Sequence, residues 1–428
     1  MTISSNNPKH EQHISVQVDS LATGGSCAGT ITFPEELRGK KAFVRGAIPG
    51  ETVEAQITYS KKKFVEAKTI SVTKTSPTRI EPSCQVFGEC GGCDLQHIRL
   101  QAQRKLKVNM VEDLLRVHGG IVPVEGTSLL DCELPGLSYR RRMSFHLNRE
   151  GQFGLYRKHG RSIVELDSCP ISTAAINTVL AESLGLIKGC APEIETVTIE
   201  DHDGIIFLAL EVHPRNHSAM TTLGDKVAFR ELCKKFPNTQ VNFRHKPIYY
   251  ATPSQSDGPP VGHFSQNNKV ANDAMLQYLI EHVETDTVTD LYAGAGNISI
   301  PLASSGKHVV AVEVNPHLVK FGKIRAEEAG VASRLTFYNE SCEKWAEKNS
   351  AGDTVVLDPP RSGALEVCKR LSPTVSSRLL YVSCYPPTFA RDIQILKERG
   401  YQLQCVKVLD MFPQTYHAEL IGILTARA

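Results

Sequence analysis

Strands and helices alternate along the last part of the chain, from about residue 266 to the C-terminus. Apolar runs at 309–314, 354–357 and 379–382 read as buried strands, and helix-like segments separate them. Parallel strands need long crossover connections, which helices usually supply, so this alternation is typical of a parallel sheet covered by helices. The sequence therefore predicts an α/β fold with a Rossmann-like domain over residues 266–428.

A glycine-containing turn follows the first strand of this region. In DLYAGAGN, residues 290–297, Gly294 and Gly296 would let the backbone approach a ligand closely. Glu313 ends the next strand, nineteen residues past Gly294, where an acid accepts hydrogen bonds from ribose hydroxyls. The third glycine of a dinucleotide fingerprint is absent, because position 299 is Ser299. We therefore expect S-adenosylmethionine, which has a ribose but no pyrophosphate, rather than a dinucleotide.

Two polar side chains stand at the ends of the next strands. Asp358 is followed by two prolines, which make a rigid and exposed carboxylate. Cys384 follows the apolar run 379–382 and precedes Tyr385 and two further prolines. The carboxyl ends of parallel strands are where α/β sheets present reactive groups, so Cys384 is a candidate nucleophile. A small buried structural cysteine is the alternative interpretation.

The composition favours a globular protein of two to four domains. The chain has 428 residues, of which 41% are hydrophobic. No run approaches the roughly 20 apolar residues of a membrane span, and the first residues are polar rather than those of a signal peptide. We therefore expect a cytoplasmic protein with no membrane partner. The net charge is only +2, so any nucleic-acid surface must be local.

Residues 1–80 are expected to form a small β-barrel. Short runs that alternate apolar and polar residues are separated by glycines, as in all-β domains. This segment holds eleven Lys and Arg against seven Asp and Glu. Its basic side chains would either contact RNA phosphates or form a solvated face.

Four of the twelve cysteines suggest a metal site, because a chain without a signal peptide is not expected to use them as disulfides. Cys84, Cys90 and Cys93 lie within ten residues, and two glycines would let the backbone wrap round a cluster. Cys169, at a proline-marked turn, is the best fourth ligand. The spacing favours an iron–sulfur cluster, although zinc would suit four thiolates as well. The site falls in a mixed α+β domain expected over residues 81–265.

Basic and aromatic residues are interleaved between residues 139 and 161. The segments YRRRMSFHL (139–147) and QFGLYRK (152–158) read as a hairpin. Such a mixture suits phosphate contacts together with base stacking. A solvated strand edge is the plainer interpretation.

The motifs together resemble those of the RNA 5-methyluridine (uridine-C5) methyltransferase family, over nearly the whole chain. Residues 84–93 are similar to its C-x5-C-x2-C iron–sulfur signature, and Cys169 falls where its fourth ligand is expected. Four further segments resemble family motifs: 264–268 (FSQNN), 290–297 (DLYAGAGN), 383–392 (SCYPPTFARD) and 410–419 (DMFPQTYHAE). The most similar branch carries an RNA-binding barrel, the TRAM domain, and methylates 23S ribosomal RNA.

The resemblance implies a role for each motif residue. Cys384 would be the nucleophile and Glu419 the general base. The residues implied in S-adenosylmethionine binding are Gln266, Tyr292, Gly294, Asn297, Glu313, Ser341 and Asp358. The ligands implied for a 4Fe-4S cluster are Cys84, Cys90, Cys93 and Cys169. The chain departs from the family at Tyr385, where relatives usually have Asn, and at Ala293, where they usually have Cys.

Methylation of uracil at carbon 5 requires both a thiolate and a base. Carbon 5 becomes nucleophilic only after a thiolate adds at carbon 6, and a base must then remove the carbon-5 proton. Cys384 and Glu419 suit these roles, and Arg391 is the basic neighbour expected to favour the thiolate. Because paired uridines are inaccessible, the RNA must be single-stranded or its uridine flipped out. We expect a monomer.

Other functions remain open. The substrate could be transfer RNA instead of ribosomal RNA. A cytosine-C5 RNA enzyme would need a second motif cysteine, and Cys368 and Cys405 lack a matching context. A non-catalytic iron–sulfur RNA-binding protein would have no use for Cys384, Glu419 and Asp358.

Overall fold

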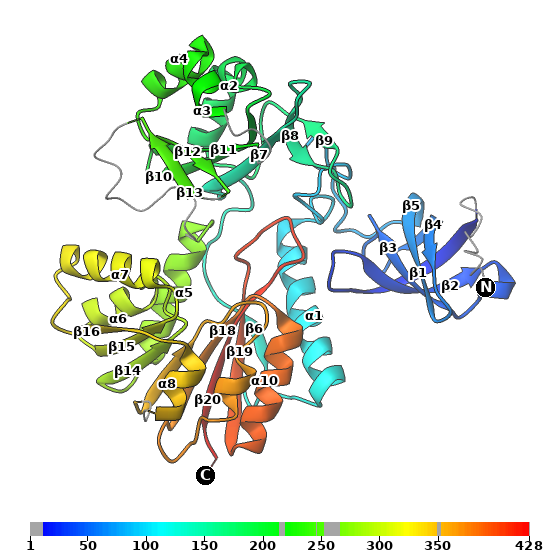
Figure 1. Ribbon diagram of the computed structural model, residues 1–428. Helices are drawn as coiled ribbons and strands as arrows, with labels where there is room; N and C mark the ends of the chain where they lie inside the picture. The colour runs from blue at the N-terminus through cyan, green and yellow to red at the C-terminus, as the bar shows by residue number, and fades with distance from the viewer. Residues whose placement is uncertain (1–11, 214–218, 245, 252–265, 349–351, 428) are drawn as a thin grey trace, which may run out of the picture.

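The computed structural model describes residues 12–213, 219–244, 246–251, 266–348 and 352–427. They form a closed barrel, a seven-stranded sheet and an eight-stranded sheet. Figure 1 shows the barrel at one side, the seven-stranded sheet with its helices at the top and the eight-stranded sheet below. The expected fold class is confirmed: a Rossmann-like domain, an N-terminal barrel and a mixed central domain.

The barrel closes in the strand order β1-β2-β3-β5-β4. Every second residue of β1, such as Ile14, Val16 and Val18, is buried inside it, which is the period of two that the sequence predicts. A short 3-10 helix, Glu35–Leu37, follows β2. The strand bounds are β1 (His13–Leu21), β2 (Cys27–Phe33), β3 (Lys41–Arg45), β4 (Thr52–Ser60) and β5 (Phe64–Lys74).

The seven-stranded sheet has the order β13-β12-β11-β10-β7-β8-β9. Apolar side chains of β7 pack with those of α2 and α4 in one core, so helices cover one face of this sheet. The strands are β7 (Arg142–Leu147), β8 (Phe153–Tyr156), β9 (Ile163–Glu165), β10 (Ile194–His202), β11 (Ile205–Val212), β12 (Thr239–Phe243) and β13 (Lys246–Tyr250). The helices are α2 (Ala174–Gly189), α3 (Ala219–Asp225) and α4 (Val227–Lys235).

The eight-stranded sheet has the order β16-β15-β14-β17-β18-β20-β19-β6. The first five strands in this order are parallel, and β20 is antiparallel to both of its neighbours. The strands are β14 (Thr287–Leu291), β15 (His308–Glu313), β16 (Leu335–Asn339), β17 (Thr354–Leu357), β18 (Arg378–Ser383), β19 (Tyr401–Leu409) and β20 (Glu419–Ala426). The helices are α5 (Lys269–His282), α6 (Ser299–Ser304), α7 (Pro316–Glu328), α8 (Cys342–Lys348), α9 (Leu365–Cys368) and α10 (Pro386–Glu398).

The strand order reverses between β14 and β17. From β14 the chain continues outward to β15 and β16 on one side, and then returns to β17 on the other. Ligands of open α/β sheets bind at the carboxyl ends of the strands at such a switch point. The glycine turn after β14 and Asp358 after β17 lie there, and the Asp358 amide donates to Leu291 O at 3.4 Å.

An element of the N-terminal half joins this sheet. Helix α1 (Leu100–Gly119) packs on α10, and β6 (Thr127–Leu129) pairs in parallel with β19. Gly120 ends α1 in the left-handed conformation, with φ +55°, where glycine is favoured. The domain boundaries at 80 and 265 stay a prediction, and the position of α1 and β6 favours counting residues 100–129 with the eight-stranded sheet.

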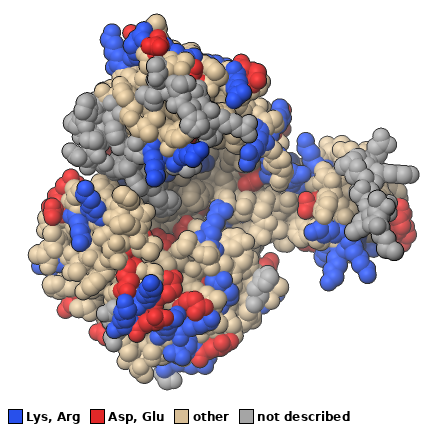
Figure 2. Space-filling model, viewed as in Figure 1, with Lys and Arg blue, Asp and Glu red and all other residues tan. Residues whose placement is uncertain are grey.

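Positive charge is concentrated on parts of this surface. Figure 2 shows Lys and Arg gathered on the barrel. It also shows them at the lower edge of the part that holds the seven-stranded sheet, facing the part that holds the eight-stranded sheet. The exposed barrel lysines include Lys41, Lys61, Lys62, Lys63 and Lys68. None of the helices in the described ranges is both long and apolar enough to cross a membrane.

Candidate active site

Cys384 lies in the turn between β18 and α10, at the edge of the sheet where the parallel strands end. Tyr385 precedes the helix and Pro386 begins it, a place where proline fits because the first helical amides need no partner. The Tyr385 amide donates to the Ser383 hydroxyl at 3.2 Å. The half-buried Cys384 side chain therefore sits in a well-defined turn.

Glu419 begins the neighbouring strand. β20 pairs antiparallel with β18, with Ser383 opposite Leu420, so Cys384 and Glu419 follow at adjoining positions. The Glu419 side chain is buried. Burial, with a further contribution from the negative charge of Asp358, raises the pKa of Glu419 well above its ordinary value. A carboxyl group whose ionised form is disfavoured thus stands beside the thiol.

The environment also disfavours the thiolate of Cys384. Burial, together with the charges of Glu419 and Asp358, raises the pKa of the Cys384 thiol to about 11, whereas the charge of Arg361 opposes that shift. Burial also raises the pKa of Asp358, to about 6. These groups influence one another at one edge of the sheet, as expected where charge develops during a reaction.

The basic neighbour of this thiol is Arg361 rather than Arg391. Arg391 pairs with the buried Asp392 carboxylate at 2.7 Å and donates to Ser362 O at 2.8 Å. Its guanidinium is therefore engaged within its own helix and the preceding loop. Arg361 follows Asp358 and two prolines in the sequence, and this position after a strand-end acid was the available signal.

The glycine turn after β14 contacts the acid at the end of β15. Gly294 and Gly296 have φ of +56° and +84°, which favours glycine. The Gly294 amide donates to Glu313 Oε2 at 3.0 Å, and the Asn315 amide donates to Oε1 at 2.7 Å. The Glu313 carboxylate is thus held at the turn, where it can accept further hydrogen bonds from a ligand.

Two other predicted cofactor residues are engaged with neighbouring side chains. Tyr292 has φ +68° and donates its hydroxyl to Glu343 Oε1 at 3.1 Å. Asn297 and Asn272 exchange side-chain hydrogen bonds of 3.0 and 3.1 Å. Asn297 therefore ties the turn to α5 in this arrangement.

The remaining predicted cofactor residues lie in loops and turns. Ser341 precedes α8, and its hydroxyl accepts from the Lys344 amide at 3.3 Å. Gln266 is half-buried just before α5, whereas Phe264 of the same motif lies outside the described residues. Asn268 begins α5, and its side chain donates to Met411 O at 3.1 Å, which joins this motif to the segment before Glu419.

Asp290 is a functional candidate that sequence reasoning did not single out. It is fully buried on β14, and one carboxylate oxygen accepts from the Ser299 hydroxyl. The other oxygen has no hydrogen-bond partner among the described residues. Burial, with Asp358 and Glu313 nearby, raises the pKa of Asp290 to about 7. A buried acid of this kind beside the glycine turn suits a cationic ligand.

The four predicted cluster ligands line one cavity. Burial raises the pKa of Cys84, Cys90 and Cys93, and the nearby Cys169 raises all three further. Within the described ranges, however, no three His, Cys, Asp or Glu side chains are arranged to hold a metal ion. The cysteines are near one another but are not in ligand geometry.

Known proteins with similar sequences are RNA methyltransferases. A family model described as tRNA (Uracil-5-)-methyltransferase matches residues 241–428. The 23S rRNA (uracil(1939)-C(5))-methyltransferase RlmD of Shewanella sp. (strain MR-7) is 31% identical over 90% of this chain and 91% of its own. RlmD of Vibrio campbellii is 31% identical over 96% of both chains. The chain belongs to the RNA uracil-C5 methyltransferase family.

A solved structure supports the fold of this uracil-C5 methyltransferase. The tRNA (uracil-54, C5)-methyltransferase of Pyrococcus abyssi, in complex with S-adenosyl-L-homocysteine, has a TM-score of 0.71 and covers 96% of this chain. All of that structure is covered, at 20% sequence identity, so the likeness establishes the fold alone.

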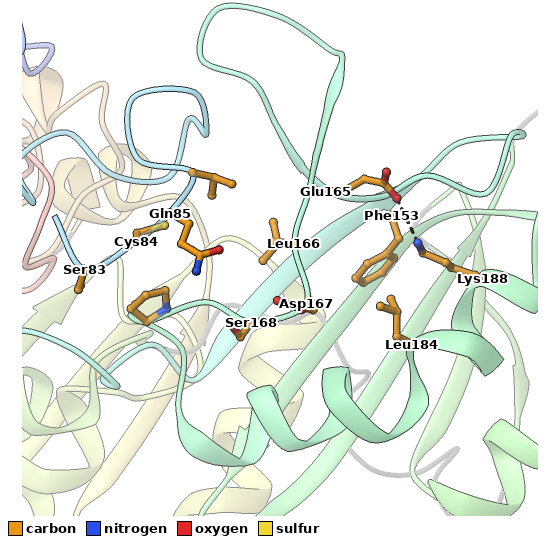
Figure 3. Close-up of a pocket in the computed structure, with 12 residues that line it drawn as sticks. Ser83, Cys84, Gln85, Phe153, Glu165, Leu166, Asp167, Ser168, Leu184 and Lys188 are labelled. Carbon is orange, nitrogen blue, oxygen red and sulfur yellow. Dashed lines mark hydrogen bonds and ion pairs between the residues drawn. The ribbon is translucent and has the colours of Figure 1, made fainter.

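A large cavity of this uracil-C5 methyltransferase joins the cysteines to the nucleophile. Its volume is about 920 Å³, and its lining includes Cys93, Arg140, Arg361, Cys384 and Tyr416. A second pocket, of about 570 Å³, is also lined by Cys84. Figure 3 shows Cys84 on one side of that pocket and Phe153, Leu184 and the Glu165–Lys188 ion pair on the other.

Proposed function

We propose that this chain methylates carbon 5 of a uridine in 23S ribosomal RNA, with S-adenosylmethionine as methyl donor. The observation that carries the proposal is the adjacency of Cys384 and Glu419 at neighbouring strand ends. Asp358 and Glu313 lie at the same sheet edge, where a cofactor is expected. Relatives named for 23S ribosomal RNA, which match nine-tenths of the chain, support this substrate.

Cys384 would start the reaction. Its thiol gives up a proton to water, and Sγ adds to carbon 6 of the uracil, so that the electron pair of the double bond becomes an enolate with density on carbon 5. S-adenosylmethionine supplies the methyl group to carbon 5. Glu419 then removes the carbon-5 proton, the double bond re-forms, and the bond between Sγ and carbon 6 breaks. The products are 5-methyluridine, S-adenosylhomocysteine, the protonated Glu419 and the Cys384 thiolate.

The charges of the site would keep Cys384 unreactive until the methyl donor is bound. Glu419, Asp358 and Asp290 all have raised pKa values in the protein alone. A positive charge nearby favours the ionised forms of thiols and carboxylic acids. The sulfonium group would therefore lower these pKa values, so that the thiolate and the carboxylate base form when the methyl donor is bound.

The cysteine set would hold a 4Fe-4S cluster with a structural role. All four thiols are free, and the Gly92 amide donates to Cys90 Sγ at 3.4 Å, a contact that iron–sulfur sites use. Small movements of the loop would be needed to reach ligand geometry. The ligands would be Cys84, Cys90, Cys93 and Cys169.

Each of the three predicted domains would have its own role in the reaction. Residues 1–80 would form an RNA-binding TRAM-like barrel, 81–265 the cluster and central domain, and 266–428 the catalytic domain, with α1 and β6 added to it. Exposed lysines on the barrel suit phosphate contacts. We propose that the protein acts as a monomer in the cytoplasm on an unpaired or flipped uridine.

Mapping of 5-methyluridine by mass spectrometry tests this function. A strain that lacks the gene should lose the modification at a site in 23S ribosomal RNA and regain it with the wild-type gene but not with Cys384→Ala. If 5-methyluridine is lost from transfer RNA instead, transfer RNA and not 23S ribosomal RNA is the substrate. An unchanged pattern in both RNAs would overturn it.

A further inference from the structure

One face of the seven-stranded sheet is not covered by the helices α2 and α4. On β7, Met143, Phe145 and Leu147 point into the helix-covered core, and the alternate residues point to the opposite face. Of these, Ser144 shares a hydrogen bond of 2.8 Å with Thr198 of β10. The exposed side of this sheet is therefore polar, and it lines the cavity that leads to Cys384.

Two aromatic rings are stacked on this face. His146 of β7 and Tyr156 of β8 have ring centroids 3.6 Å apart and an interplanar angle of 11°. Burial lowers the pKa of His146, which keeps the imidazole uncharged at neutral pH. Tyr156 remains 38% exposed, and both rings line the cavity. A parallel stack with an accessible ring is the arrangement on which proteins stack unpaired bases.

The cysteine loop, residues 84–93, holds this stack in place. The Gly91 amide donates to Tyr156 O at 3.0 Å, and the Lys158 amide donates to Glu89 O at 3.0 Å. Arg157 also pairs with Glu89 at 2.6 Å. A Cβ atom on Gly91 would lie 3.2 Å from Tyr156 O, so the two chains approach closely. The backbone of Tyr156 is therefore fixed by the segment that carries Cys90.

The stack and the nucleophile line the same cavity, together with positively charged side chains. This lining includes Cys384, Tyr156 and His146 as well as Arg140 and Arg361. Arginine side chains in a groove bind phosphates and disfavour a basic or apolar partner. A strand whose uridine reaches Cys384 would pass over the stack.

We propose that Tyr156 and His146 form a stacking platform for a second unpaired nucleotide of the RNA, a near neighbour of the target uridine. This rests on the proposed function. The Tyr156 ring would stack on the face of the base. The platform would therefore increase the affinity for RNA and fix the position of the strand, without distinguishing one base from another by hydrogen bonds. The cysteine loop holds Tyr156. The platform therefore gives this loop a role in RNA binding that does not require it to take part in the chemistry.

The test combines enzyme variants with RNA that lacks one base. Binding of a target RNA fragment to the full-length protein is measured for a series of RNAs, each abasic at one position near the uridine. For the wild type, one abasic position should weaken binding about 5- to 150-fold, the range for one stacked base. Tyr156→Ala should weaken binding of intact RNA by a similar factor. This variant should then bind the RNA that is abasic at that position as well as it binds intact RNA. Tyr156→Phe should behave as the wild type.

The controls separate platform, fold and function. Tyr338→Ala removes another exposed tyrosine, on β16, and should leave the abasic profile unchanged. His146→Ala removes the supporting ring and serves if Tyr156→Ala does not fold. If both Tyr156 and His146 variants keep the sensitivity of the wild type to every abasic position, the platform proposal is overturned. Normal RNA binding by a wild type that never methylates would instead overturn the proposed function.

Discussion

Lys107 of α1 and Asp410, which follows β19, form an ion pair inside the protein with Nζ and Oδ1 2.5 Å apart. Their side chains are 0% and 1% exposed. Lys107 also donates to Phe412 O at 3.0 Å. Burial lowers the pKa of Lys107, and the charge of Asp410 opposes that shift. A helix from the N-terminal half thereby anchors the segment that leads to Glu419.

Replacement of this lysine should be strongly destabilising. Lys107→Met leaves the Asp410 carboxylate buried without its closest partner, so the free energy of unfolding should fall by about 3–5 kcal/mol in urea denaturation. The double variant Lys107→Met/Asp410→Leu should regain most of the loss, since an apolar pair of similar volume is often neutral. Lys269→Met removes a half-exposed pair with Asp273 and should cost below about 1 kcal/mol. Failure of the double variant to recover would contradict this account.

The space beside Gly294 gives a prediction for the cofactor. A Cβ atom there would meet nothing within 4 Å, so Gly294→Ala would fill open space at the turn where S-adenosylmethionine is expected. Calorimetric titration with S-adenosylhomocysteine should show affinity lowered about tenfold or more, equal to about 1.4 kcal/mol. Gly330→Ala is the matched control, because its φ of +68° is similar and its Cβ would also be free. Both variants carry the same backbone strain, so equal affinities would contradict a cofactor at this turn.

The cysteine cluster predicts a change in iron content. Cys93→Ser removes one of the four proposed ligands, and anaerobically purified protein should lose most of its iron and acid-labile sulfide together with visible absorbance. Cys233→Ser changes a half-buried cysteine of α4 in the same lobe and should leave both contents unchanged. Zinc in place of iron in the wild type would support the other metal that the spacing allows. Neither metal in protein purified without oxygen would refute the site.

The sequence predicted the elements whose signals are local. Strand-end acids, the glycine turn and the proline-flanked Cys384 could be assigned because each follows a buried apolar run. Their convergence also follows from topology, since parallel strands end at the same edge of a sheet. The placement of Glu419 opposite Cys384 needed one further fact, that β20 returns antiparallel to β18.

Contacts between distant segments could not be predicted in this way. β6 has only three residues, too few for a periodic signal, and it pairs with a strand far along the chain. Gln103 donates to Gln414 Oε1 at 2.8 Å, a contact that no spacing in the sequence reveals. The sequence likewise does not reveal that Arg361, and not Arg391, is the arginine whose charge acts on the thiol. The reason is that Arg391 is paired with the Asp392 carboxylate.

The charges round Cys384 predict the pH dependence of covalent attack. The thiolate is the reactive form, and the pKa of Cys384 is raised to about 11, so formation of the RNA adduct should accelerate as pH rises. Glu419→Gln removes a charge that raises this pKa, so adduct formation should begin at lower pH. Arg361→Ala removes a charge that lowers the pKa and should shift the profile to higher pH.

Adduct stability gives the second half of that experiment. Glu419→Gln cannot remove the carbon-5 proton, so methylated RNA should stay bound to Cys384 and migrate with the protein in denaturing gels. The double variant Cys384→Ala/Glu419→Gln should form no such band at any pH. Normal turnover by Glu419→Gln would assign the base to another residue. The half-buried Asp358 would be the next to change, since its pKa of about 6 suits proton transfer near neutral pH.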